Sequence, residues 1–172
     1  MSNIIDFYDP KKKYGLFSNF YVSPIKINGK KFNTVEHYFQ YKKFDDPWYQ
    51  EQIYKQNTPG KVKFLSSQQK GARFPWMRSL YEIVKESIKR GIKPIENWDR
   101  IRNFVMIEGV VAKFTQNPRL MKELLATKGK ILREASLRNY YWGIGKNQDG
   151  VNMLGKILMC LRDIVIKRNL KF

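Results

Sequence analysis

The segment from Asn33 to Phe44, NTVEHYFQYKKF, places an acid, an amide and an amine at regular spacing: Glu36, Gln40 and Lys43. Side chains four and seven positions apart return to one face of an α-helix, because each residue advances about 100° around its axis. Such a set contains the side-chain types of acid–base and nucleophilic chemistry. It equally suits a solvated helix face, with Glu near the start and Lys near the end, where both favour the helix dipole.

Two tryptophans indicate a pocket for a planar ring. Trp98 stands at an expected helix start, and Trp142 lies in the Gly-rich segment YYWGIG, where a large ring either lines a ligand site or anchors the core. Gly143, Gly145 and Gly150 permit close backbone approach by a ligand. Their spacing matches neither the dinucleotide fingerprint nor the Walker pattern.

Metal and serine-hydrolase chemistry have little support in the sequence. The lone His37 points about 100° away from Glu36 and is expected to be a packed or capping residue. No Cys/His cluster has metal-ligand spacing, and a Ser-His-Asp arrangement has one histidine to draw on. We expect neither a metal nor a cofactor.

The elements that position these residues are mostly helices. Asn28-Gly29 between alternating segments predicts a β-hairpin, and Thr34 is a plausible N-cap for a helix that runs until Pro47. Further predicted helices cover residues 48–56, 59–69, 76–90, 98–116, 118–127 and 151–168; residues 130–136 predict a short strand, and 137–150 an irregular loop. Only the first few residues are expected to be loose.

The composition indicates one globular domain over residues 1–172, with 42% hydrophobic residues and a net charge of +18. This charge attracts anionic partners and is compatible with either a nucleic-acid surface or lysines scattered over solvated faces. The single Cys160 is expected in the core, and its isolation favours a reducing compartment. With neither a signal peptide nor a membrane span in the sequence, we expect a cytoplasmic protein.

Several separated motifs recur in the order of a known family. They are LFSNFY, EHYFQYKKF, the Trp of NWDRIR, VM…AKF.QNP.L, L.EAS, YYWGIG and G.N.LGK.LM..R. Together they resemble the YbiA-like, or NADAR (NAD and ADP-ribose associated), N-glycosidases from about Phe17 to Arg162. The resemblance implies a mostly α (α+β) single domain that cleaves the bond between a ribose and a base-like amine. Its substrates would be riboflavin-pathway phosphoribosylaminopyrimidines or ADP-ribosyl-guanine.

The resemblance also assigns roles. Glu36 would stabilise the oxocarbenium-like sugar and deprotonate water; Lys43 would form a ribose imine, protonate the leaving base or hold phosphate. The remaining expected substrate contacts are Asn19, Phe20, Gln40, Trp98, Asn139, Trp142, Gly143, Asn152, Lys156 and Arg162. Of these, Asn152, Lys156 and Arg162 are expected at phosphate.

Two features depart from the family pattern. Asn139 and Asn97 stand where relatives usually carry aspartate, so the hydrogen bonding is kept and the charge is lost. A basic insert over about residues 70–93 is expected to cap the site or contact nucleic acid. The alternative function is therefore a catalytically weak nucleotide- or nucleic-acid-binding module; the oligomeric state is not indicated.

Overall fold

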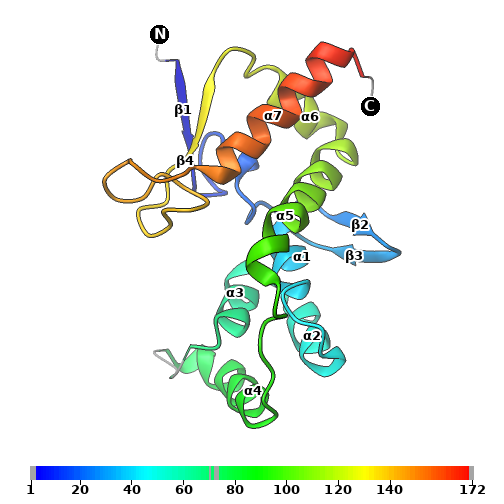
Figure 1. Ribbon diagram of the computed structural model, residues 1–172, viewed down its shortest axis with the longest axis vertical. Helices are drawn as coiled ribbons and strands as arrows, with labels where there is room; N and C mark the ends of the chain where they lie inside the picture. Colours follow the sequence, from blue (N-terminus) through cyan, green and yellow to red (C-terminus); the bar gives the residue numbers. More distant parts are fainter. Residues whose placement is uncertain (1–2, 70, 72–73, 171–172) are drawn as a thin grey trace. The chain divides into compact units, whose positions relative to one another are not determined.

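The computed structural model describes residues 3–69, 71 and 74–170 (Figure 1). It contains two compact units: one combines the chain up to Ser23 with the chain from Val110 onward, and the other is Pro24–Gly109. Seven α-helices and four short strands occur among the described residues, which confirms the expected mostly helical α+β class. The helix α5 (Trp98–Thr115) contributes residues to both units.

In the unit Pro24–Gly109, strands β2 (Ile25–Ile27) and β3 (Lys30–Phe32) form the predicted antiparallel hairpin. Asn28 and Gly29 both have positive φ, 49° and 78°, as a two-residue type I′ turn requires. The helices α1 (Val35–Tyr41), α2 (Pro47–Tyr54), α3 (Pro59–Ser67) and α4 (Arg78–Lys89) follow, with a 3₁₀ turn η2 (Pro75–Met77) before α4.

The helix α1 begins as predicted and ends earlier. Thr34 Oγ1 accepts a hydrogen bond from the His37 N–H at 3.2 Å, which confirms the N-cap. The helix ends at Tyr41, so the expectation of a helix up to Pro47 is wrong. Phe44 leaves the helical path to enter the core formed with Tyr49, at 4.8 Å between ring centroids. Lys43 therefore follows α1 rather than lying on its face.

The core of this unit lies between α2, α3 and α4. Tyr49, Ile53, Val62, Leu65 and Val84 are buried there with Phe44. This core consists of apolar side chains from three consecutive helices and from the segment that precedes them. His37 is also buried: its ring nitrogens lie 2.7 Å from Thr34 Oγ1 and 3.1 Å from Gln56 O, so the packed and capping role is confirmed.

The other unit contains a parallel strand pair, of which the sequence predicted only the strand over residues 130–136. Strand β1 (Ile4–Phe7) pairs with β4 (Ile131–Glu134) in the register Ile4 with Ile131, so residues expected to be loose form a strand. Arg133 Nε donates to Asp6 Oδ1 at 2.7 Å across the pair. A parallel partner so distant in sequence leaves no hairpin signal.

Two helices complete this unit, α6 (Pro118–Leu125) and α7 (Met153–Arg168), and α7 packs against β4. Cys160 is exposed on α7, which corrects the expectation of a core position, because the apolar stripe turns inward at Leu154, Ile157 and Leu158 instead. In the described part of the chain, no helix combines the length and apolar character that crossing a membrane needs.

Lys113, near the end of α5, is a buried amine that the sequence did not single out. It is 1% exposed, and its Nζ donates to the Ser18 carbonyl at 2.8 Å. The rings of Tyr21 and Phe114 each lie 5.5 Å from Nζ. Burial lowers the pKa of Lys113 to about 7, because the apolar surroundings disfavour the ammonium form.

The Lys113 amine should make stability depend on pH. Between about pH 7 and 10.5 the unfolded chain binds this proton and the folded chain does not, so the free energy of unfolding rises with pH by up to about 1.4 kcal/mol per unit. The measurement is urea unfolding of wild type and Lys113→Met at pH 6.5, 8 and 9.5. The free energy of unfolding of the wild type should rise with pH relative to that of the variant. Parallel pH curves for the two proteins would refute the lowered pKa.

Candidate functional site

Glu36 and Gln40 form a buried hydrogen-bonded pair on α1. The two side chains belong to residues that are 6% and 8% exposed, and Gln40 Nε2 donates to Glu36 Oε1 at 2.8 Å. A solvated helix face is thereby excluded. The amide oxygen of Gln40 is buried and has no hydrogen-bond partner among the described residues. A buried acceptor in this state fits a ligand that supplies an N–H or O–H donor.

The environment of Glu36 favours its protonated form. Burial raises the pKa of the Glu36 carboxyl, because desolvation disfavours the carboxylate. The charge of Lys63, the hydrogen bond from Gln40 and the charge of Lys43 act in the opposite direction and are smaller effects. A carboxylate with a raised pKa is a stronger base than an exposed one, which suits proton transfer in acid–base catalysis.

Lys43 lies beside this pair with its amine partly desolvated. Its Nζ donates to the backbone carbonyl of Ser66 on α3 at 2.9 Å. Burial lowers the pKa of Lys43, whereas the charges of Glu36 and Asp99 favour the ammonium form. Glu36 and Lys43 thus influence each other, although the helical spacing that first connected them does not hold at Lys43.

Lys63 is a residue of this site that sequence reasoning missed. It is exposed on α3, and its backbone carbonyl accepts a hydrogen bond from Ser66 Oγ at 3.1 Å. Ser66 is also the residue whose carbonyl accepts from Lys43. The packing of α3 on α1 brings the positive charge of Lys63 close enough to oppose the rise that burial causes in the pKa of Glu36. That packing is tertiary, so no sequence spacing could indicate it.

Trp98 supplies an aromatic surface in the same unit. Its ring centroid lies 4.9 Å from that of Phe39 on α1, with 59° between the ring planes. An open cavity of about 750 Å³ adjoins the start of α5. Its lining is mainly polar, formed by Asp45, Ile95, Glu96, Asn97, Asp99 and Arg100. The Ile95 N–H donates to the Lys43 carbonyl at 3.0 Å, which joins this lining to the Lys43 backbone.

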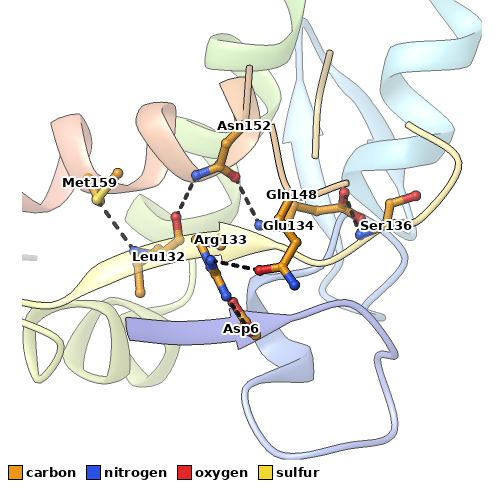
Figure 2. Close-up of polar contacts among 8 residues, drawn as sticks. All are labelled: Asp6, Leu132, Arg133, Glu134, Ser136, Gln148, Asn152 and Met159. Atoms are coloured by element: carbon orange, nitrogen blue, oxygen red, sulfur yellow. Dashed lines mark hydrogen bonds and ion pairs between the residues drawn. The ribbon is translucent and has the colours of Figure 1, made fainter. Parts of the chain in front are cut away.

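In the other unit, Asn152 fixes the loop before α7 to strand β4 (Figure 2). Its Oδ1 accepts from the Glu134 N–H at 2.9 Å, and its Nδ2 donates to the Leu132 carbonyl at 2.8 Å. Asn152 also adopts a left-handed backbone conformation with φ 54°, which Asn tolerates better than most residues. Asn152 is thus engaged with the backbone of β4.

Glu134, from the L.EAS motif, was not among the predicted site residues. Its Oε2 accepts from the Ser136 N–H at 3.3 Å (Figure 2). A Cβ on Gly143 would lie 2.0 Å from the same oxygen and 2.7 Å from the Glu134 carbonyl. Position 143 therefore requires glycine, because the Glu134 side chain occupies the space that a Cβ would need. The group that approaches the Gly143 backbone closely is thus Glu134 of the same chain.

Asn139 holds the tryptophan loop. Its Oδ1 accepts from the N–H groups of Tyr141 at 3.1 Å and Trp142 at 2.9 Å. The rings of Tyr141 and Trp142 meet edge to face at 5.0 Å. An aspartate at position 139 would accept the same two bonds, so the Asn preserves this turn.

The remaining predicted contacts differ in their availability. Arg162 is buried, with Nη1 donating to the carbonyls of Thr127 and Lys130, each at 2.8 Å; this guanidinium holds the turn before β4. Lys156 is exposed on α7. Asn19 is buried and Phe20 half-buried after the 3₁₀ turn η1 (Gly15–Phe17). A phosphate contact from Arg162 stays a prediction, as do the roles of the other three residues.

The predicted site residues fall into two groups. The unit Pro24–Gly109 brings together Glu36, Gln40, Lys43 and Trp98. The other unit contains Asn19, Phe20, Asn139, Trp142, Gly143, Asn152, Lys156 and Arg162. The first group holds the acid–base and nucleophilic side chains.

The fold and this group define a small, mostly helical α+β protein with a buried acid–amide pair beside a desolvated lysine. The NADAR domain matches residues 6–165, and the chain belongs to that family. It is 39% identical over 161 residues to the N-glycosidase YbiA of Shigella boydii, covering 93% of this chain and 87% of that protein.

A solved structure and a longer relative extend the comparison. The NMR structure of YbiA from E. coli matches with a TM-score of 0.78 and 33% identity, covering 100% of this chain and 90% of that one. A riboflavin biosynthesis protein of Vibrio vulnificus is 33% identical over 163 residues, which are 95% of this chain and 39% of the relative.

Proposed function

We propose that this protein is an N-glycosidase that hydrolyses the C–N bond between a phosphorylated ribose and a base-like amine. The observation that carries the proposal is the buried Glu36 carboxyl, hydrogen-bonded to Gln40 and influenced by two lysines. Kinship with proteins named N-glycosidases supports the reaction class.

The chemistry assigned to Glu36 follows from the charge of the transition state. Departure of the base leaves oxocarbenium-like positive charge on the sugar, which an adjacent carboxylate stabilises. The same carboxylate accepts a proton from the attacking water, whose oxygen bonds to the anomeric carbon as the C–N bond breaks. Glu36 then passes this proton to the departing nitrogen, which releases the neutral base and restores the carboxylate. The Gln40 amide, by donating to Glu36 Oε1, orients the carboxyl, and its own oxygen remains available to a substrate donor.

Lys43 suits a covalent route to the same products. Its lowered pKa increases the share of neutral amine, which is the nucleophilic form. Attack of Nζ on the anomeric carbon forms a glycosylamine, and the base leaves with one of the amine protons. The ribose ring then opens to an imine as the second N–H proton moves to the ring oxygen. Water then hydrolyses the imine, releasing the sugar as an aldehyde and restoring the amine. The atoms balance with one water consumed, as in direct hydrolysis.

Two further features bear on the substrate. Lys63 places an exposed cation beside Glu36, which suits the phosphate of a phosphoribosyl or ADP-ribosyl group. Trp98 offers a surface on which the base would stack. Riboflavin-pathway phosphoribosylaminopyrimidines and ADP-ribosyl-guanine both carry these groups. A relative named for riboflavin biosynthesis supports the first of the two.

The test is detection of the released base by mass spectrometry. Purified protein is incubated with a phosphoribosylaminopyrimidine and, separately, with ADP-ribosylated guanosine. We expect free base and a phosphorylated sugar from the first substrate at a rate that rises with enzyme concentration. If neither substrate releases base, the glycosidase proposal is refuted, and the alternative, a module that binds such nucleotides without turnover, is favoured.

A further inference from the structure

The turn before α4 displays two large aromatic rings to solvent. Phe74 and Trp76 are 47% and 53% exposed, although each has enough apolar surface to favour burial. Their rings are nearly parallel, with 5° between the planes and 6.3 Å between centroids. They lie in the basic insert, of which Lys70, Ala72 and Arg73 are outside the described residues. Neither ring belongs to the proposed catalytic site.

The backbone fixes this pair in place. Phe74 is extended, and Pro75 begins the 3₁₀ turn η2. The Met77 N–H donates to the Phe74 carbonyl at 2.9 Å, which closes the turn. Proline restricts φ, so the rings need lose little backbone freedom when a ligand stacks on them. A preorganised, exposed pair of parallel rings offers flat faces of the size of a nucleobase.

The charge around the rings is positive. Arg78 follows directly on η2 and is exposed, as are Lys85, Lys89 and Arg90 on α4 and Lys93 beyond it. Residues 74–93 contain five basic side chains against two acidic ones, Glu82 and Glu86. These two acids pair with Lys85 and Arg90 and leave the basic surplus intact. Phosphate groups complement this surface.

From these observations we propose that Phe74 and Trp76 form a stacking platform for single-stranded nucleic acid, with the cations of α4 at its phosphates. Aromatic faces combined with cations are the usual basis of sequence-tolerant binding to single strands, because every base has a π-face. A duplex would not expose its base faces to such a pair. The proposal concerns the insert alone and holds or fails independently of the glycosidase activity.

The experiment measures fluorescence anisotropy of a labelled 12-nucleotide single strand of mixed sequence and of an abasic strand of equal length. Wild type should bind the base-containing strand about ten-fold or more tightly than the abasic one. The double variant Phe74→Ala/Trp76→Ala should lose that preference while retaining the salt dependence that the phosphates cause. Phe104→Ala is the matched control, since Phe104 is a 73% exposed ring on α5, outside the insert, and its removal should leave strand binding unchanged.

Several outcomes would overturn the platform. Equal binding of both strands by wild type would indicate attraction by charge alone. Unaltered base preference in the double variant would place stacking elsewhere. Absence of strand binding, combined with retention of the protein on anionic vesicles that the double variant abolishes, would assign the rings to a membrane surface. Both variants remove exposed side chains, so thermal unfolding should match wild type and show that loss of fold is not the cause.

Discussion

Glu36→Gln should reduce kcat for base release by about 100- to 1,000-fold, the range expected when one group supplies both charge stabilisation and proton transfer. The change keeps the shape of the side chain. The hydrogen bond from Gln40 Nε2 can still form, because the amide oxygen of the new residue accepts it. KM should change little, because the carboxylate acts mainly on charge that develops in the transition state. The measurement is steady-state release of the base.

The stability of this variant provides the control. The raised pKa of Glu36 means that the folded chain holds this proton more strongly than the unfolded chain. Stability contributed by the protonated carboxyl is therefore lost as pH rises above about 4.5. Over that rise in pH, the free energy of unfolding of the Gln variant should increase relative to that of wild type. A Gln variant that unfolds more readily at neutral pH would show damage to the fold.

A second Glu→Gln variant distinguishes the specific role of Glu36 from a general effect of removing one negative charge. Glu86→Gln removes a half-exposed acid that pairs with Arg90 at 2.8 Å on α4, and we expect turnover to be unchanged. If Glu36→Gln retains more than about a third of wild-type kcat, the central role of Glu36 is wrong. The pH profile adds a second criterion, because the limb that reports Glu36 should vanish in the variant.

The local signals in the sequence predicted most of the helices and the hairpin. Asn28-Gly29 and Thr34 act through their immediate neighbours, so their structures follow from short-range chemistry. Strand β1 escaped prediction because its partner lies across the chain: Asp6 and Arg133 are 127 positions apart. The end of α1 depended on Phe44 entering the core, which is also a tertiary effect.

The candidate site shows the same division. The motifs identified Glu36, Gln40 and Lys43, and the structure adds that the acid–amide pair is buried. Lys63 could not be inferred, because its proximity to Glu36 arises from the packing of α3 on α1. In the sequence, Asn139 stood out because it lacks the charge of the family's aspartate. In the structure, its hydrogen bonds to the loop need only an acceptor oxygen, which Asn provides.

The covalent route makes a second large prediction, at Lys43. Both Lys43→Met and Lys43→Arg should lower kcat about 100-fold or more, although Arg keeps the positive charge. A guanidinium remains protonated at neutral pH and cannot attack the anomeric carbon as an amine. Desolvation at position 43 lowers the pKa of Lys43 and so favours its nucleophilic neutral form, whereas an arginine there would stay charged.

Reductive trapping distinguishes this role from phosphate binding. Cyanoborohydride added during turnover should reduce the imine and leave one open-chain, reduced sugar phosphate attached through C1 to wild-type protein, located at Lys43 by peptide mass spectrometry. Neither variant should form the adduct, and Lys63→Met, which removes a cation and no proposed nucleophile, should still form it. Near-normal turnover by Lys43→Arg would show that a fixed positive charge suffices. In that case the Nζ at 2.9 Å from Ser66 O acts as an anchored cation, and hydrolysis proceeds by direct attack of water with Glu36 as the base.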